Sequence, residues 1–285
     1  MSAGPLSIAT AFYYLDVSVM TRVAAVLGRG DDEARFSRLA ARIKQAFNER
    51  FYDPVCGYYD GGIQSAQAWP LVFGLVPDNE VDKVTGFLVG LVGDRQRRLT
   101  TGYTSTKFAI QALSRAGRND IVWQRAIATD YPSWGYMLRR HRTTSCERWD
   151  GERGSFNHAP LGAAIDEWFY ADLAGIRPDI NAPGYERIVF KPYIPPGLTW
   201  ARASLQTMRG RVATGWEQHD GQVRLEITVP ANSRGVVHIP CGNAITEGGR
   251  PAAEADGITE IGTAETETIF EIGSGEYSFV FPAPA

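Results

Sequence analysis

The sequence predicts an α-then-β protein of two domains, a toroid of helical hairpins over residues 1–180 and an antiparallel β-sandwich over residues 181–285. Up to about Pro178, apolar residues recur every three or four positions, which is the spacing of amphipathic helices. Beyond Pro178, short segments alternate apolar and polar residues and are separated by turn residues. No segment repeats with the period of a solenoid. Paired helices with loops rich in Gly, Thr, Trp and Tyr therefore favour a toroid.

The helices follow from apolar spacing and from the residues that begin or end them. The first starts after Pro5 and stops at Gly28, and Asp31 and Asp32 are expected to cap the second. The segment FYDPVCGYYDGG predicts a loop or a short hairpin, because Pro and Gly interrupt the helical pattern. Further helices are expected at Ser65–Val76, Asp78 to Gly93, Ser105–Ala116, Asp120–Thr129 and Pro160–Ala174, the last burying Leu161, Ile165, Trp168, Phe169 and Leu173.

The strands of the second part are short and regularly interrupted by turns, which is typical of a sandwich. They are expected in the segments APGYERIVFKPYIPPG, ARASLQTMRGRVATGWEQ, QVRLEITVP, RGVVHIP, TETIFEIGS and EYSFVFP.

Composition limits the classes of function. A chain of 285 residues with 44% hydrophobic and 21% charged residues is typical of a soluble globular protein. The net charge of −3 argues against a nucleic-acid partner, and no apolar run is long enough to predict a membrane span. The three cysteines form neither a disulfide pattern nor a metal knuckle. With no basic signal-peptide region at the N-terminus, these features favour the cytoplasm.

Common catalytic motifs are absent from the sequence. There is no Walker loop, no dinucleotide-binding glycine pattern after a strand, no H-E-x-x-H and no G-x-S-x-G. The four histidines show no ligand spacing. No cofactor and no metal are therefore expected.

Aromatic and polar residues are concentrated in the expected loops between helices. Sugar rings pack their C–H faces on aromatic side chains while their hydroxyls need polar partners, so this mixture predicts a carbohydrate site. The candidate contacts are Gln67, Trp69, Tyr103, Trp134, Tyr136 and Trp149. Other interpretations stay open: Trp69 suits a helical core, and Trp134, in the loop YPSWGYM, suits packing as well as a pocket.

The segment TTSCERWDGERGSFNH supplies the candidate catalytic group, Glu147, together with Asn157 and His158. A carboxylate of this kind can activate a water molecule. Two structural interpretations compete with this. Glu147 can pair with a neighbouring arginine, and Asn157 suits the N-cap of the following helix.

Several motifs together resemble the bacterial α-L-rhamnosidases of glycoside hydrolase family 78. They are PSWGYM, TTSCERWDG, SFNHAPLGAAIDEWFYADLAGIRPD and PGYERIVFKP, with similarity also in the first helices and in LTTGYTST. The resemblance implies an (α/α)6 barrel followed by a β-sandwich, and inverting hydrolysis of terminal α-L-rhamnose from a glycoside substrate. It places the general base on Glu147 and a sugar-binding histidine on His158.

The sequence also departs from that family. His141 and Arg142 replace the family's Gly-Ala before the two threonines, and Cys146 replaces an aromatic residue. These changes affect the expected shape of the sugar pocket. The acidic, Trp-containing motif that carries the family's general acid does not occur here. Asp60, Asp150, Glu152 and Glu167 remain as acids without a motif to single one out.

The expected helices are fewer than a complete (α/α)6 barrel needs. The chain is therefore expected to be the C-terminal part of such an enzyme, inactive alone and prone to self-association through exposed helix faces. Two alternatives stay open. One is a non-catalytic carbohydrate-binding protein, built from the aromatic loops or the sandwich. The other is a further (α/α)6 enzyme such as a sugar phosphorylase, with LRRHR (138–142) holding phosphate.

Overall fold

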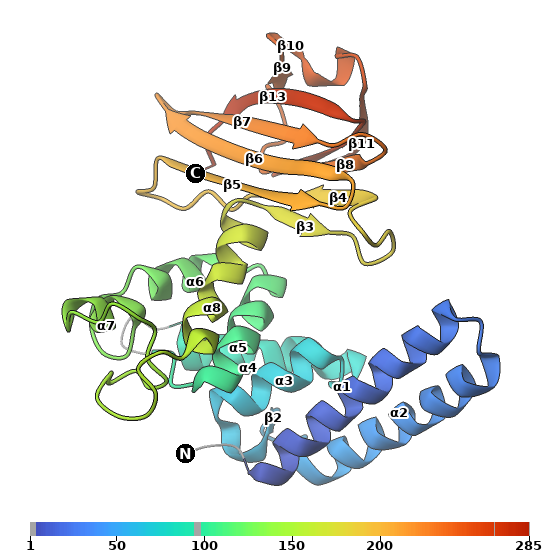
Figure 1. Cartoon of the computed structure of the whole chain (residues 1–285), viewed down its shortest axis with the longest axis vertical. Helices are drawn as coiled ribbons and strands as arrows, with labels where there is room; N and C mark the ends of the chain where they lie inside the picture. Colours follow the sequence, from blue (N-terminus) through green and yellow to red (C-terminus); the bar gives the residue numbers. More distant parts are fainter. Residues whose placement is uncertain (1–3, 94–97, 265, 285) are drawn as a thin grey trace. The chain divides into compact units, whose positions relative to one another are not determined.

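The computed structural model describes residues 4–93, 98–264 and 266–284. The chain divides into two compact units, a helical unit, Met1–Ile165, and a β unit, Asp166–Ala285. Figure 1 shows helices through the first and strands through the second, so the predicted fold class, helical hairpins followed by β-sheets, is confirmed. In the described part of the chain, no helix has the length and apolar character needed to cross a bilayer.

The helices pair along the chain, and α1 and α2 form a long antiparallel hairpin (Figure 1). A π-helix, Phe169–Leu173, continues α8. The helices are α1 (Pro5–Val26), α2 (Gly30–Phe51), α3 (Gln64–Phe73), α4 (Val81–Val92), α5 (Tyr103–Arg115), α6 (Asn119–Ala126), α7 (Trp134–Arg139) and α8 (Ala159–Trp168).

Two predictions about the ends and faces of helices were wrong. Asp31 and Asp32 do not cap α2: its N-cap is Arg29, without a side-chain hydrogen bond. Both aspartates lie in the first turn, where they favour the positive end of the helix dipole. Phe169 is 37% exposed, because the backbone changes from α-helix to π-helix at this residue and rotates the apolar face.

The segment YPSWGYM was expected to be a loop, but it contains α7, which begins at Trp134. Ser133 is the N-cap, and its Oγ accepts a hydrogen bond from the Tyr136 N–H at 3.0 Å. This helix has only six residues and follows a cis Tyr131–Pro132 bond. So short a helix has too few positions for an apolar period to appear.

The core of the helical unit forms where α1, α2 and α3 meet the short hairpin β1–β2 (Tyr52–Asp53 and Tyr58–Tyr59). Tyr59 is fully buried against Phe47, with the ring centroids 5.5 Å apart. Gln67 on α3 holds this hairpin in place. Its Oε1 accepts from the Tyr59 N–H at 2.8 Å, and its Nε2 donates to the carbonyls of Tyr59 and Ile63.

One face of α1 carries apolar side chains that no residue described by the structure covers. The seven largest are Leu6, Tyr13, Val19, Met20, Val23, Val26 and Leu27, which are 41–87% exposed. A helix normally buries such a stripe against a neighbour.

The β unit contains two sheets whose apolar faces supply its core. Phe270 on β12 and Phe279 on β13 belong to different sheets and stack at 5.8 Å. The six-stranded sheet has the order β10-β9-β13-β7-β6-β5, from Arg250–Pro251, Thr246–Glu247, Gly275–Pro282, Gln222–Val229, Gly210–His219 and Trp200–Thr207. The other has the order β11-β12-β8-β4-β3, from Ile258–Ala264, Glu267–Ile272, Arg234–Ile239, Arg187–Phe190 and Ile176–Pro178.

One strand pair departs from the predicted antiparallel arrangement. β4 and β8 run parallel, with Arg187 opposite Arg234 and Phe190 opposite Val237. Alternation of apolar and polar residues gives the face of a strand but not the direction of its neighbour. The other strand pairs of both sheets are antiparallel within the described residues.

Candidate active site

The loop between α7 and α8 is closed on itself by backbone hydrogen bonds. The Glu147 N–H donates to the Ser155 carbonyl at 2.9 Å, and the His158 N–H donates to the Ser145 carbonyl at 2.7 Å. The Thr144 hydroxyl also donates to the Phe156 carbonyl. These contacts bring Glu147 and His158 into one folded loop, although eleven positions separate them in the sequence.

The Glu147 carboxylate is fixed by the backbone rather than by a cation. Its Oε2 accepts a hydrogen bond from the Ser155 N–H at 2.9 Å. Gly154 makes this approach possible, because a Cβ at this residue would lie 2.7 Å from Oε2. Gly154 also has a φ of +82°, a conformation that side chains other than glycine rarely adopt.

The alternative role considered for Glu147 was an ion pair with a neighbouring arginine, and no such pair occurs among the described residues. Arg153 pairs with Asp150 at 3.1 Å, and the Arg142 guanidinium lies over the Phe156 ring at 5.1 Å. Glu147 takes part in none of the ion pairs found among residues 4–93, 98–264 and 266–284. The side chain is partly exposed, and Oε1 has no hydrogen-bond partner among the described residues.

Trp134 and Trp149 form an edge-to-face pair with ring centroids 5.0 Å apart. The Trp134 Nε1–H donates to the Leu161 carbonyl at 3.0 Å, and the Trp149 Nε1–H donates to the Thr101 carbonyl at 2.7 Å. Trp149 is 8% exposed, whereas Trp134 is partly exposed. Trp134 therefore offers more ring surface to a ligand, and Trp149 packs against it in the interior.

Tyr103, the first residue of α5, lies against His158 with ring centroids 4.4 Å apart. The Nε2 atom of His158 is buried and has no hydrogen-bond partner in the part of the chain that the structure describes. A buried imidazole nitrogen without a partner is costly, so a ligand hydroxyl at this position would offset that cost. Tyr103 itself is 38% exposed.

The other predicted contacts lie in different surroundings. Tyr136 packs edge-to-face on Tyr131 at 5.3 Å, and Asn157 is exposed, with its N–H donating to the Ser155 hydroxyl at 3.3 Å. Gln67 is 0% exposed and bonded to the hairpin, and Trp69 is 2% exposed in the helical core. The structure thus brings together Tyr103, Trp134, Glu147, Trp149 and His158, and places Gln67 and Trp69 in the interior.

Gln64 has a positioning role that the sequence analysis did not detect. Its Nε2 donates to the Arg98 carbonyl at 2.6 Å, and its Oε1 accepts from the Thr100 N–H at 2.9 Å. The next residue, Thr101, accepts the indole N–H of Trp149. In the sequence, Gln64 is only a glutamine near the start of an expected helix, and such a residue is usually an ordinary surface residue.

Three of the four carboxylates considered as acids, Asp60, Asp150 and Glu152, are engaged elsewhere. The backbone N–H of Glu152 and the neighbouring Arg153 hold the pKa of Asp150 below its ordinary value, so Asp150 stays ionised. Glu152 pairs with Arg140 at 2.7 Å. Asp60 accepts from the Gly4 N–H at 2.8 Å and from the Ser7 hydroxyl at 2.6 Å, at the start of α1. A general acid must carry a proton, which does not suit Asp150.

No group of three or more His, Cys, Asp or Glu side chains is arranged to hold a metal ion within the described ranges.

Two family descriptions match the chain. Residues 5–173 match the bacterial alpha-L-rhamnosidase 6 hairpin glycosidase domain, and residues 175–251 match the bacterial alpha-L-rhamnosidase C-terminal domain. An alpha-L-rhamnosidase of Streptomyces avermitilis is 33% identical over 95% of this chain and 26% of its own length. One from Alteromonas sp. (strain LOR) is 30% identical over 79% of this chain and 25% of its own length.

Solved structures show the same similarity. The crystal structure of Streptomyces avermitilis alpha-L-rhamnosidase complexed with L-rhamnose has a TM-score of 0.87 and 30% identity, covering 96% of this chain and 26% of that one. The alpha-L-rhamnosidase from Dictyoglumus thermophilum has a TM-score of 0.86 and 31% identity, covering 96% of this chain and 31% of that one. The chain thus spans about a quarter of the length of the curated relatives it matches.

Proposed function

Because the chain belongs to the bacterial α-L-rhamnosidase family of six-hairpin glycosidases, as its sequence motifs predict, we propose that it forms part of an enzyme that hydrolyses terminal α-L-rhamnose from glycosides. The observation that carries the proposal is the Glu147 carboxylate, which is free of any described ion pair and is held by the Ser155 N–H. A carboxylate in this state can take a proton from water.

We assign Glu147 the role of general base in an inverting reaction. The base removes a proton from a water molecule as that water attacks the anomeric carbon from the face opposite the leaving group. An acid on the other side of the sugar protonates the leaving oxygen, and the two carboxyl groups lie roughly 6.5–9.5 Å apart in such enzymes. The Ser155 N–H donates to Oε2 and so fixes the orientation of the carboxylate that would accept this proton.

The residues beside Glu147 are assigned to sugar binding. The unpartnered Nε2 of His158 would bond a sugar hydroxyl, and Tyr103 keeps the imidazole in place. Trp134, supported by Trp149, would pack against the C–H face of the ring. Asn157 and Tyr136 remain candidates at the edge of this site. Gln67 and Trp69 act on it through the core that carries α3, because neither side chain reaches solvent.

We place the general acid in a part of the parent protein outside these residues. The bonds made by Asp60, Asp150 and Glu152 support this placement, since Asp60 is bonded at the start of α1 and the other two have partners within their own loop. The chain also spans only about a quarter of its curated relatives. We therefore expect little or no hydrolysis by the 285 residues alone.

The test uses the full-length parent with an aryl α-L-rhamnoside. Glu147→Gln keeps the shape of the side chain and removes its basicity, so kcat should fall by roughly 10²–10⁴-fold. Glu152→Gln, which changes an exposed carboxylate of the same loop, is the matched control and should stay close to wild type. NMR of the first-formed sugar distinguishes inversion from retention. Full activity in Glu147→Gln would exclude this residue as the base.

Binding without turnover is the competing outcome. If every form of the parent binds L-rhamnose in calorimetry and none hydrolyses the aryl rhamnoside, the protein is a carbohydrate-binding protein. If release of sugar requires inorganic phosphate and yields a sugar phosphate, it is a phosphorylase.

A further inference from the structure

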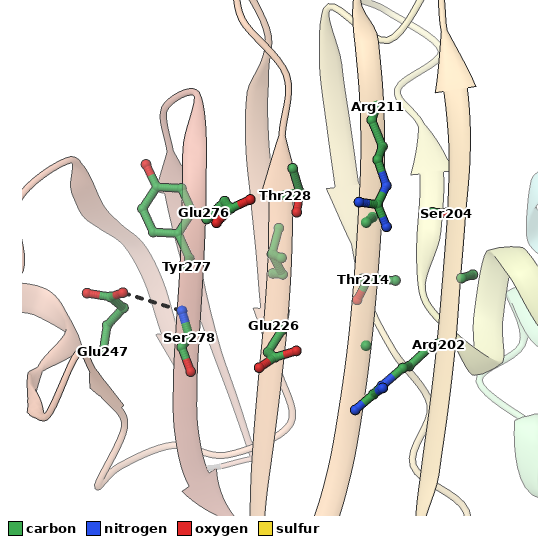
Figure 2. Close-up of a pocket in the computed structure, with 14 residues that line it drawn as sticks. Arg202, Ser204, Arg211, Thr214, Glu226, Thr228, Glu247, Glu276, Tyr277 and Ser278 are labelled. Atoms are coloured by element: carbon green, nitrogen blue, oxygen red, sulfur yellow. Dashed lines mark hydrogen bonds between the residues drawn. The ribbon is translucent and has the colours of Figure 1, made fainter.

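A hollow lies on the solvent-facing side of the six-stranded sheet, within the β unit and separate from the loop that carries Glu147. Its volume is about 590 Å³, which lies within the usual range for small-molecule pockets. Figure 2 shows two guanidinium groups on one side of the hollow and carboxylates on the other. The main lining side chains are Arg202, Ser204, Arg211, Glu226, Glu276 and Ser278.

Small side chains at the centre of the sheet create the hollow. Ala213 on β6 lies between Ser204 on β5 and Thr228 on β7, and the next outward position is Gly215. A Cβ at Gly215 would lie 2.9 Å from the Cγ of Arg202, so the arginine stem occupies the space above the glycine. Large side chains at these positions would fill the hollow.

The charged groups around the hollow do not neutralise one another. Arg211, Glu226 and Glu276 belong to none of the ion pairs of the described residues, while Arg202 pairs with Glu217. Arg211 lies on β6 and Glu276 on β13, with β7 between them. Their backbones are two strand spacings apart, about 9–10 Å, and no ion pair joins the two side chains across the hollow in the described part of the chain.

An exposed tryptophan lies on the same face. Trp200, Arg202 and Ser204 alternate along β5, and their unbroken pairing with Glu217, Gly215 and Ala213 puts all six on one side of the sheet. Trp200 is 59% exposed, whereas Trp69, Trp149, Trp168 and Trp216 are at most 8% exposed. A large apolar ring left in water next to a polar hollow is typical of a binding surface.

We propose that this face binds a neutral oligosaccharide, with Trp200 as the stacking platform and the free charged groups of the hollow as partners for its hydroxyls. The mixture of charges supports this class of ligand. Three carboxylates, Glu226, Glu247 and Glu276, would repel a phosphate or an acidic peptide, and the two arginines would repel a cation. Sugar hydroxyls donate and accept, so they can bond both walls at once.

The site does not rest on the catalytic assignment of Glu147, because it is built entirely from the β unit. It would bind a glycan independently of cleavage.

Fluorescence quenching tests the proposal on the 285-residue chain. Trp200 is the most exposed of the seven tryptophans, so acrylamide should quench it first. Methyl α-L-rhamnoside and an α-L-rhamnosyl-glucose disaccharide are the probes, and sodium sulfate is the anion control. Either sugar should reduce the accessible fraction of the emission by at least about half. In Trp200→Phe, that accessible component and its protection should both disappear.

Calorimetry with the disaccharide supplies the matched comparison. Trp200→Ala removes the stacking platform, and Ala213→Phe fills the hollow. Each variant should bind the disaccharide at least tenfold more weakly than wild type. Ile261→Ala, at a 54% exposed residue on the other sheet, should bind like wild type. His158→Ala removes sugar binding at the loop that carries Glu147. The heat of binding that arises at the six-stranded sheet should remain in this variant.

Three results would overturn the proposal. In the first, Trp200→Ala and Ala213→Phe bind the sugar as wild type does while His158→Ala abolishes binding, which leaves the proposed active site intact. In the second, sulfate protects Trp200 as well as sugar does. In the third, Trp200→Ala changes the association state of the chain but not its affinity for sugar, which would identify the face as a protein contact.

Discussion

Glu147 and Ser155 bond each other twice: the Glu147 N–H donates to the Ser155 carbonyl, and the Ser155 N–H donates to Oε2 of Glu147, both at 2.9 Å. The first bond fixes the backbone of the loop, and the second fixes the orientation of the carboxylate. A carboxylate held in this way is oriented by a main-chain N–H and not by a cation.

Gly154 tests that arrangement. In the parent protein, Gly154→Ala brings a Cβ against Oε2 and should lower kcat roughly 10²-fold, with little change in KM, because the proposed base is displaced rather than the bound sugar. Gly151→Ala is the control: Gly151 also has a positive φ, +65°, but a Cβ there would come no closer than 3.4 Å to a neighbour. An equal loss of kcat in both variants would attribute the effect to backbone strain.

His158 should affect binding more than chemistry. His158→Ala removes the unpartnered Nε2 and the ring that faces Tyr103, so KM of the parent for an aryl rhamnoside should rise about tenfold or more. Asn157→Ala, at the exposed neighbour, is expected to have a smaller effect. Steady-state kinetics separates the two parameters, and an unchanged KM in His158→Ala would remove this residue from the sugar site.

Gln67 is predicted to matter for stability. Gln67→Met keeps the size of the side chain but leaves the buried N–H and carbonyl of Tyr59 without partners. The free energy of unfolding should fall by about 1–3 kcal/mol, as measured by urea denaturation. Gln45→Met, at an exposed position on α2, is the control and should lie within about 0.5 kcal/mol of wild type.

The pH dependence of stability should depend on His238. Burial and the nearby Lys191 lower the pKa of His238, although Glu267 opposes them. The unfolded chain therefore binds the proton more readily than the folded chain does. The stabilising contribution of the neutral imidazole is present above the ordinary histidine pKa of about 6.5 and is lost as the pH falls below it. Urea midpoints should decline between about pH 7 and pH 5, and His238→Gln should flatten that decline.

Self-association through α1 also stays a prediction. At micromolar concentrations the chain should sediment as more than a monomer, because the α1 stripe is uncovered in the described residues. Met20→Glu combined with Val23→Glu should weaken association at least tenfold. Val55→Glu, which changes an 87% exposed valine outside α1, should not. A monomer in wild-type sedimentation would refute the prediction.

Sequence periodicity predicted the long elements well, because amphipathic helices and alternating strands record which face is buried. It failed where the structure depends on contacts between distant segments. The parallel pairing of β4 with β8 leaves no trace in either strand. Gln67 resembled a loop residue that binds sugar, but it is a buried clamp on Tyr59.

The candidate site was predictable to a similar degree. The motif around Glu147 pointed to the carboxylate, whereas the support from Ser155 and Gly154 required knowledge of how the loop folds back. The positions of Trp134 and Trp149 depend on the carbonyls of Leu161 and Thr101, respectively, which accept their indole N–H groups and lie in other segments of the chain.

The link from Gln64 through Thr100 and Thr101 to Trp149 offers a practical handle for protein engineering. Libraries aimed at substrate preference usually randomise residues that touch the ligand, and here they would disturb the loop that holds Glu147. Residues 98–101 belong to the connection between α4 and α5, and Thr101 in this segment accepts the hydrogen bond from the Trp149 indole. Substitutions in residues 98–101 would shift the position of Trp149 in small steps. They would leave the sequence of the loop between α7 and α8 unchanged.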